Sequence, residues 1–396
     1  MDLKLFDGEV YENREEEIEE LRKYNDEEIN MKYISGDIRI VTEQARYPLS
    51  TILEMITEEN SKYKLNPDYQ RRRRWDDTKK SRLIESIIIN VPIPPIFLYE
   101  YEFAKFEVMD GLQRLTTICD FYSDKFKLEG LEQWSELNGK TYSELPTKIR
   151  EGIDRRYLSS IILLYETGNN NEQKANFLKK LVFERLNSGG VKLSYQESRN
   201  ALYNGPFNEL CIKLSRNKYF CIMWNIPTDE EDSKLTDNDM FKCMDDVELV
   251  LRFFALRLLE TRNDVNSWKN YFDSILREGN KLNSEILTKY NILFNDTMKL
   301  IYDVLGENAF YLFRLRNGKW YWLERPTKVV YDPIVRVFSQ LIDKKDILMQ
   351  KKVEIQSKIE KFYMDNYDDF EGRNNNKVNI IKRTNLIYDF ISEFLE

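Results

Sequence analysis

The chain has 396 residues, a formal net charge of -8 and 42% hydrophobic residues. A chain of this length has room for about two to three domains and at least one substantial hydrophobic core. It contains no histidine, which excludes Ser-His-Asp and Cys-His nucleophile systems, Cys/His zinc sites and HNH-type nuclease centres. Any chemistry would therefore depend on carboxylates, backbone amides, Arg and Lys side chains, and a bound metal.

Several features of the sequence concern its cellular location. It has no apolar run of about 18 residues or more, so we expect no membrane-spanning segment. The acidic stretch Met1–Asp7 lacks the basic and apolar regions of a signal peptide. The four cysteines (Cys119, Cys211, Cys221 and Cys243) form no C-x-x-C pair, which is typical of a reducing compartment. We therefore expect a cytoplasmic protein.

The first part of the chain is strongly charged. Gly8–Asn30 is rich in Glu, and we interpret it as a charged helix or a mobile arm whose acidic face is solvated. Ile38–Val41 is a candidate for a short strand. Tyr47–Ser50 leads into a predicted helix that carries Leu53 and Ile56.

A run of four arginines, Arg71–Arg74, follows Gln70 and precedes Trp75. Such a run repels itself and usually has an anionic partner, and the planar guanidinium suits phosphate. Trp75 could stack on a base or anchor the loop in the core, and we favour the core. Asp76 or Asp77 then caps a predicted helix, whose inner face consists of Leu83, Ile84, Ile87 and Ile88.

The next stretch predicts a strand, a tight turn and a helix. Ile96–Tyr101 and Phe106–Met109 are predicted strands, Asp110–Gly111 is the turn, and Leu112–Tyr122 is a helix with apolar residues three or four apart. The first N–H groups of a helix are unpaired and lie at its positive end, where anions bind. Polar and basic residues occupy the first turns: Gln113, Arg114, Thr116 and Thr117. An ordinary strand–turn–helix with a solvent-facing Arg is the alternative, and spacing alone does not decide between them.

Further elements are expected between residues 126 and 205. Residues 126–128 and 137–142 suggest short strands, and 146–154 a short helix. Residues 157–165 form a buried strand and 172–186 a helix that ends at the glycines after Asn187. Ser194 and Glu197 form a capping box for one more helix.

Long amphipathic helices are predicted from residue 206 onward. They cover residues 237–262, 264–279, 282–304, 332–343, 345–363 and 377–395, with a loop over 365–376. Residues 310–323, which contain Asn317–Gly318, predict a β-hairpin. We therefore expect an α+β protein with a charged segment over 1–44, an α+β domain over 45–205 and a mainly helical domain over 206–396.

Five motifs occur in the order found in one known family. They are Asn66–Arg71 with Trp75, Leu83–Ser86, Val91–Pro95, Asp110–Thr117 and Phe183–Ser194. In these motifs the chain resembles the DGQQR family, also called domain of unknown function 262. This is a ParB/sulfiredoxin-like domain of GmrSD-type modification-dependent restriction proteins. The resemblance covers roughly residues 45 to 205.

The resemblance implies a ParB/sulfiredoxin-like fold that binds a nucleoside triphosphate (NTP) with Mg²⁺, in a family linked to NTP hydrolysis and phage defence. Carried over by motif, Gly111, Gln113 and Arg114 would hold phosphate, with Thr116 and Thr117 in the same turns. Gln70 and Arg71 would approach from the facing loop. Asn187 would lie nearby with Glu184, the candidate metal ligand. Asp110 and Gln113 would align the attacking water.

Two departures from the family pattern qualify this interpretation. Leu112 replaces the first Gln of DGQQR, so hydrolysis is expected to be weakened while binding persists. A histidine-free chain also cannot contain the HNH nuclease half, so residues 206–396 are expected to bind a partner, DNA or a second copy.

Three functions are compatible with the sequence. The first is a nucleotide-binding regulatory subunit, with or without NTPase activity, whose effector or nuclease is a separate chain. The second is a DNA-binding module that uses Arg72, Arg73 and Arg74 with Arg71 as a phosphate clamp. The third is a metal-dependent nuclease built on dispersed carboxylates, which we favour least because dispersed carboxylates are more often caps and surface charges.

Overall fold

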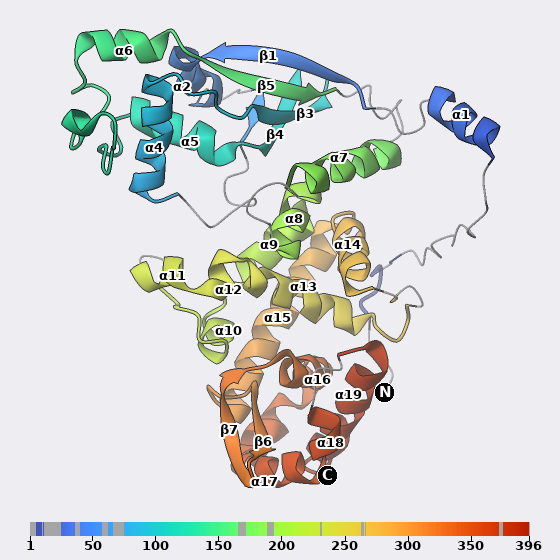
Figure 1. The fold of residues 1–396 in the computed structure, drawn as a ribbon. Helices are drawn as coiled ribbons and strands as arrows, with labels where there is room; N and C mark the ends of the chain where they lie inside the picture. The colour runs from blue at the N-terminus through green and yellow to red at the C-terminus, as the bar shows by residue number, and fades with distance from the viewer. Residues whose placement is uncertain are drawn as a thin grey trace. The chain divides into compact units, whose positions relative to one another are not determined.

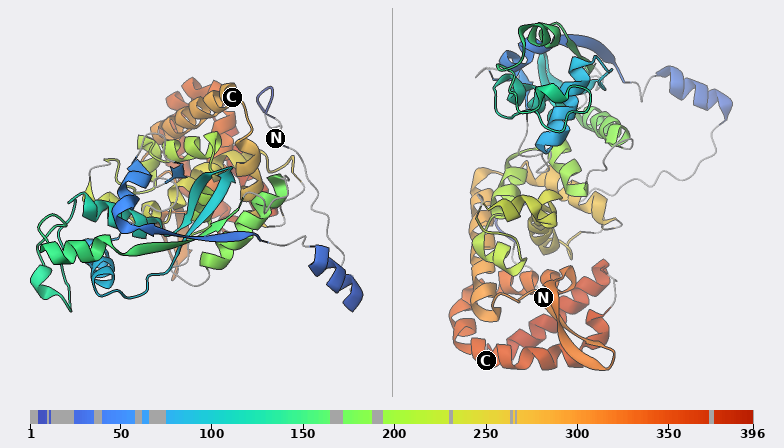
Figure 2. Two further views of the ribbon diagram at one scale, coloured as in Figure 1. Left: turned by 90° about the horizontal axis from the view of Figure 1, so that it is seen from above. Right: turned by 60° about the vertical axis from the view of Figure 1, so that its left-hand side comes forward.

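The structure is a computed structural model. It describes residues 5–9, 11, 25–35, 40–57, 62–65, 75–164, 172–187, 194–229, 232–262, 265, 267–371 and 375–395. The chain divides into two compact units (Figures 1 and 2). The sheet unit comprises Glu19–Leu202, and the helical unit comprises Met1–Ile18 together with Tyr203–Glu396. The sequence-based domain boundaries after residues 44 and 205 stay predictions.

A mixed five-stranded sheet forms the centre of the sheet unit, in the order β1-β5-β3-β4-β2. Its strands are β1 (Thr42–Pro48), β2 (Tyr63–Lys64), β3 (Ile96–Glu102), β4 (Lys105–Asp110) and β5 (Tyr157–Leu163). The β1–β5 and β3–β4 pairs are antiparallel, whereas the β3–β5 and β2–β4 pairs are parallel. Because β2 runs parallel to β4, both strands point toward the same end of the sheet, where β4 ends at Asp110.

Both faces of this sheet are covered, which explains the nearly continuous apolar runs of β3 and β5. The larger core lies on one face, and helices α2 (Leu49–Thr57), α4 (Asp77–Ile88), α5 (Leu112–Tyr122) and α6 (Thr147–Asp154) contribute to it. A smaller core on the other face includes Phe183 of α7 (Glu172–Asn187) and Ala201 of α8 (Tyr195–Leu202). Val108 belongs to the larger core and its neighbour Met109 to the smaller one, as the alternation of side chains along a strand requires. Helix α1 (Asp26–Ser35) also belongs to this unit.

The helical unit is built from many helices (Figure 1). They enclose one large apolar core. The helices are α9 (Pro206–Leu214), α10 (Lys218–Met223), α11 (Ser233–Asp237), α12 (Asp239–Lys242), α13 (Asp245–Arg257), α14 (Trp268–Gly279), α15 (Ser284–Leu305), α16 (Lys328–Gln340), α17 (Lys345–Asp365), α18 (Tyr367–Phe370) and α19 (Lys377–Ser392). A β-hairpin, β6 (Tyr311–Arg316) with β7 (Lys319–Pro326), packs beside α17. Its turn residues Asn317 and Gly318 both have positive φ, at 52° and 75°, which is typical of a two-residue hairpin turn.

The α+β class and the mainly helical C-terminal part are confirmed. Among the individual elements, the two strands that precede the Asp110–Gly111 turn, helix α5, the 310–323 hairpin and the capping box of α8 form as predicted. In that box, Glu197 N donates to Ser194 Oγ at 3.0 Å, and Ser194 N donates to Glu197 Oε2 at 2.7 Å. Between the two candidate caps of α4, Asp76 is the N-cap, because its carboxylate accepts from Lys79 N.

Several predicted elements are wrong. Ile40 and Val41 are not in a strand, and β1 begins at Thr42; residues 38 and 39 lie outside the described residues. Residues 126–128 and 137–142 form no strands, although Leu128 and Gly139 are joined by a backbone hydrogen bond of 2.7 Å. The predicted helix 237–262 is divided at Met244, whose φ of 57° is left-handed and ends the helical path between α12 and α13. The expected loop over 365–376 contains the short helix α18.

No helix in the part of the chain that the structure describes is both long enough and apolar enough to cross a membrane.

Candidate functional site

The turn between β4 and α5 requires glycine. Gly111 has φ +97°, a left-handed conformation that L side chains rarely adopt. A Cβ atom at this position would lie 2.5 Å from Ile96 Cγ2 on the neighbouring strand β3. The predicted tight turn is therefore confirmed, and it brings the backbone directly into the first turn of α5.

The N-terminus of α5 carries no side-chain cap, because its N-cap residue is Gly111. The neighbouring helix α4 differs, since the carboxylate of Asp76 accepts a hydrogen bond of 2.8 Å from Lys79 N. The N-terminus of α4 thus carries a carboxylate cap from its own chain, whereas the N-terminus of α5 has no side-chain cap. The first amides of α5 and the positive end of the helix dipole make the start of α5 the better anion site of the two.

Arg114 is held beside this helix end rather than facing solvent. Its Nη2 atom donates to Asp110 Oδ2 at 3.1 Å and to the carbonyl of Pro95 at 3.2 Å. The side chain is 16% exposed and that of Asp110 is 39% exposed. Arg114 Nε is buried and makes no hydrogen bond to any described residue. The arginine is therefore preoriented by the same Asp-Gly turn that starts the helix.

The other polar residues of the first two turns bond within the protein. Thr116 Oγ1 donates to Leu112 O and Gln113 O, and Thr117 Oγ1 donates to Gln113 O at 2.7 Å. Their hydroxyl protons are thus used by the helix itself, and Thr117 is only 1% exposed. The structure brings Asp110, Gly111, Gln113, Arg114 and Thr116 together around the N-terminal end of α5, where Gly111 and Thr117 are buried and the others are partly exposed.

The first described residue after the Arg71–Arg74 run, Trp75, contacts this end of α5. Gln113 Oε1 accepts a hydrogen bond of 3.2 Å from Trp75 N. Trp75 packs partly buried against the larger core of the sheet unit, as favoured from the sequence. Gln70 and the four residues Arg71, Arg72, Arg73 and Arg74 lie outside the described residues. Their predicted phosphate and DNA contacts stay predictions.

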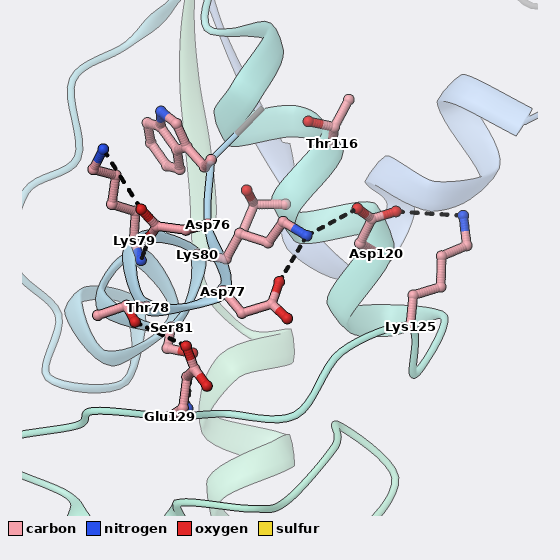
Figure 3. A network of polar contacts seen from close by, with 12 residues as sticks. Asp76, Asp77, Thr78, Lys79, Lys80, Ser81, Thr116, Asp120, Lys125 and Glu129 are labelled. Atoms are coloured by element: carbon pink, nitrogen blue, oxygen red, sulfur yellow. Dashed lines mark hydrogen bonds and ion pairs between the residues drawn. The ribbon is translucent and has the colours of Figure 1, made fainter. Parts of the chain in front are cut away.

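A network of charged residues fixes α4 against α5 (Figure 3). Lys80 Nζ lies between two carboxylates, 3.0 Å from Asp77 Oδ1 and 4.0 Å from Asp120 Oδ2, and Lys125 Nζ is 3.3 Å from Asp120 Oδ1. On the same helix, Thr78 donates to Glu129 Oε1 at 2.8 Å. The network holds the two helices whose N-terminal ends meet at Trp75 and Gln113. No sequence signal paired Lys80 with Asp120 or Thr78 with Glu129, because these residues come from distant segments.

Residues 49–204 match the family model described as the GmrSD restriction endonuclease, N-terminal domain. This segment belongs to that domain family. No curated protein and no solved structure matches the chain. The family resemblance drawn from the motifs is thus confirmed, while the likeness to ParB and sulfiredoxin folds stays a prediction.

The GmrSD N-terminal domain begins at the first residue of α2 and extends two residues beyond α8. It therefore contains β2 to β5 and the whole Asp110–Arg114 turn, whereas β1 precedes it. Leu112, which replaces a family Gln, is 6% exposed and belongs to the larger core. A side chain at position 112 points into the protein in this structure, so Leu112 acts as a packing residue.

Helix α7 contacts strand β4, which leads into the Asp110–Gly111 turn. It lies on the face of the sheet that carries the smaller core. Lys179 Nζ lies 2.6 Å from Glu107 Oε2, three residues before Asp110, and both side chains are nearly buried. Lys179 also lies over the Tyr99 ring, 5.0 Å from its centroid. Sequence reasoning missed this pair, because a Lys and a Glu 72 residues apart give no local pattern.

Two predicted residues lie toward the end of α7. Glu184, the predicted metal ligand, is exposed, and the side chain of Asn187 lies outside the described residues. Among the residues that the structure describes, no group of three or more Cys, Asp or Glu side chains is arranged to hold a metal. The roles assigned to Glu184 and Asn187 stay predictions.

Proposed function

We propose that the GmrSD N-terminal domain of this chain binds a nucleoside triphosphate with Mg²⁺ and acts as the regulatory part of a restriction or phage-defence system. The observation that carries the proposal is the combination of an uncapped helix N-terminus at Gly111 with a held guanidinium at Arg114. The family match supports the restriction context. Phosphate binding at such helix ends is a general property of α/β proteins.

The proposed binding mode uses groups that are already in position. The first amides of α5 donate to phosphate oxygens. Arg114 provides the positive charge, and its buried Nε has no acceptor among the described residues. Asp110 and the Pro95 carbonyl hold the guanidinium before the ligand arrives, which reduces the entropy lost on binding.

A nucleotide-bound Mg²⁺ would fit the donor set near the turn. Mg²⁺ on a nucleotide keeps several waters and needs only one or two protein carboxylates in addition to phosphates. Asp110 offers one partly exposed carboxylate, whose Oδ2 faces Arg114. Mg²⁺ would supply charge neutralisation of the phosphates, while Asp110 would both orient Arg114 and offer its second oxygen to the ion.

Turnover is expected to be slow relative to binding. Position 112 lies in the core and cannot align a water, and Gln113 Oε1 is occupied by Trp75 N. We therefore propose that the domain responds mainly to nucleotide occupancy. Because these 396 residues contain no histidine, an HNH nuclease centre that serves this system would have to lie outside them.

The test is equilibrium binding and turnover of ATP, GTP, CTP and UTP with Mg²⁺. Arg114→Ala should weaken binding of the preferred nucleotide by about 10- to 100-fold, since a hydrogen bond to a charged group contributes about 1.5–3 kcal/mol. Arg82→Ala, an exposed arginine on α4, is the matched control and should bind normally. If the intact chain binds none of the four nucleotides, or if both variants lose affinity equally, the proposal fails.

A further inference from the structure

The beginning of the chain is part of the helical unit. Leu5–Glu9 and Tyr11, which we call the N-terminal segment, group with residues after Tyr203 and not with the sheet unit that follows them in sequence. The side chain of Glu9 is fully buried there, at 0% exposure. A charged residue near a chain end is usually exposed, so this burial requires specific partners.

Glu9 obtains those partners from two helices of the helical unit. Its Oε1 accepts a hydrogen bond of 2.8 Å from the hydroxyl of Tyr290 on α15. Its Oε2 lies 3.4 Å from Arg257 Nη2 at the end of α13 and accepts from Phe6 N at 2.8 Å. The carboxylate is thus satisfied by a cation, a phenol and a backbone amide, which a buried charge requires.

Two aromatic residues of the segment, Phe6 and Tyr11, contact Tyr290, and Phe6 also contacts Arg257. The Arg257 guanidinium lies over the Phe6 ring, 5.3 Å from its centroid, and that ring is 6.2 Å from the Tyr290 ring. The hydroxyls of Tyr11 and Tyr290 are 3.1 Å apart. Burial raises the pKa values of both tyrosines, so both phenols stay protonated and can donate near neutral pH.

Arg257 and Tyr290 therefore contact a defined set of side chains and not merely an apolar patch. The set is an aromatic residue at Phe6, a carboxylate at Glu9 and a tyrosine at Tyr11. Each of the three contacts Tyr290, and two of them contact Arg257. This resembles the way a folded domain binds a short peptide through a few anchoring side chains.

We propose that the helical unit has a peptide-binding site centred on Arg257 and Tyr290, and that the chain's own N-terminal segment is its resident, releasable ligand. This goes beyond the proposed function, which concerns the sheet unit. Covalent attachment gives a tethered ligand an effective concentration of about 1 mM. A segment that binds in trans with a Kd of about 100 µM would then keep the site roughly 90% occupied, so that a stronger competitor can displace it.

The test releases the N-terminal segment from the site in the full chain and then measures the binding of an added peptide. Glu9→Lys places a second cation beside Arg257 and should release the segment. A fluorescent peptide of residues 3–13 should bind this variant at least about tenfold more tightly than it binds the intact chain. The same peptide with Glu9→Gln should bind the opened variant at least about tenfold more weakly, because it lacks the carboxylate.

Controls separate recognition from loss of fold. Lys299→Ala, an exposed change on the same helix α15, should behave like the intact chain. If the Glu9→Lys chain is less stable, the wild-type peptide should raise its melting temperature and the Glu9→Gln peptide should not. A variant that lacks residues 1–11 provides a second chain with an empty site. Absence of binding and of thermal rescue in both opened chains would overturn the proposal. So would equal peptide affinity for the intact and the opened chains.

Discussion

At the scale of single residues, the candidate site depends on one backbone conformation and one guanidinium. The conformation of Gly111 was predictable, because Asp-Gly between a strand and a helix is a local turn signal. The position of Arg114 was not, since its partners include the carbonyl of Pro95, 19 residues earlier. Sequence spacing identified the residue but could not distinguish a solvent-facing arginine from one held against the sheet edge.

Replacing Gly111 with alanine should destabilise the sheet unit strongly. The left-handed backbone costs about 1–2 kcal/mol for an L residue, and the new Cβ would meet Ile96 Cγ2 at 2.5 Å, which adds overpacking of about 1–3 kcal/mol. Urea unfolding should therefore show a loss of at least about 2 kcal/mol. Nucleotide affinity should fall as well, because the turn positions both the α5 amides and Arg114.

Gly139→Ala is the matched control for this change. Gly139 has a similar φ of +84°, but an added Cβ there would meet nothing within 4 Å. It should lose only the backbone contribution of about 1–2 kcal/mol and should keep its nucleotide affinity. Equal losses in the two variants would show that contact with Ile96 is unimportant.

At the scale of elements, local patterns predicted helices and strands best where one segment contains its own signals. The α5 periodicity, the Ser194–Glu197 box and the Asn317–Gly318 turn are all of this kind, and all three formed. Strand β1, with the sequence TEQARYP, has no apolar alternation. It forms because β5 pairs with it along its whole length, and such a distant partner is invisible in a local window. The division at Met244 likewise depends on packing, since Met244 is fully buried.

The α7–β4 contact is the element-scale feature with the clearest energetic consequence. Lys179 and Glu107 form a nearly buried ion pair, and removing one partner of such a pair leaves an uncompensated buried charge. Lys179→Met should therefore cost about 3–5 kcal/mol. The double variant Lys179→Met with Glu107→Leu removes both charges and should recover most of that loss, as measured by urea unfolding of the three proteins.

The same series tests whether α7 contributes to nucleotide binding. If α7 brings Asn187 to the ligand, the double variant should be nearly as stable as wild type and yet bind nucleotide more weakly. Lys105→Ala breaks an exposed pair with Glu102 at the far end of the β3–β4 hairpin and should change neither property. An unstable double variant would contradict the assignment of the loss to an isolated buried charge.

At the scale of the whole molecule, the chain contains two units with separate cores. The apolar core of the helical unit includes no residue of the sheet unit among the described residues, and the converse is also true. The sequence indicated this division through its change to long helices after residue 206. It could not show that the N-terminal segment belongs to the later unit, because the contacts of Glu9 with Arg257 and Tyr290 join residues more than 200 positions apart.

Separate cores should give separate unfolding transitions, and nucleotide should shift only one of them. Scanning calorimetry of the full chain is expected to show two transitions. With Mg²⁺ and the preferred nucleotide at about 100 times its Kd, the free energy of unfolding of the sheet unit should rise by about 2.7 kcal/mol. The transition of the helical unit should stay unchanged. Gly111→Ala should lower the melting temperature of the sheet-unit transition and so identify it. Glu9→Lys should lower only that of the helical-unit transition, because the carboxylate it replaces is buried in the helical unit. A single transition that responds to both substitutions would mean that the two units unfold as one cooperative body, and nucleotide occupancy would then be sensed by the whole chain.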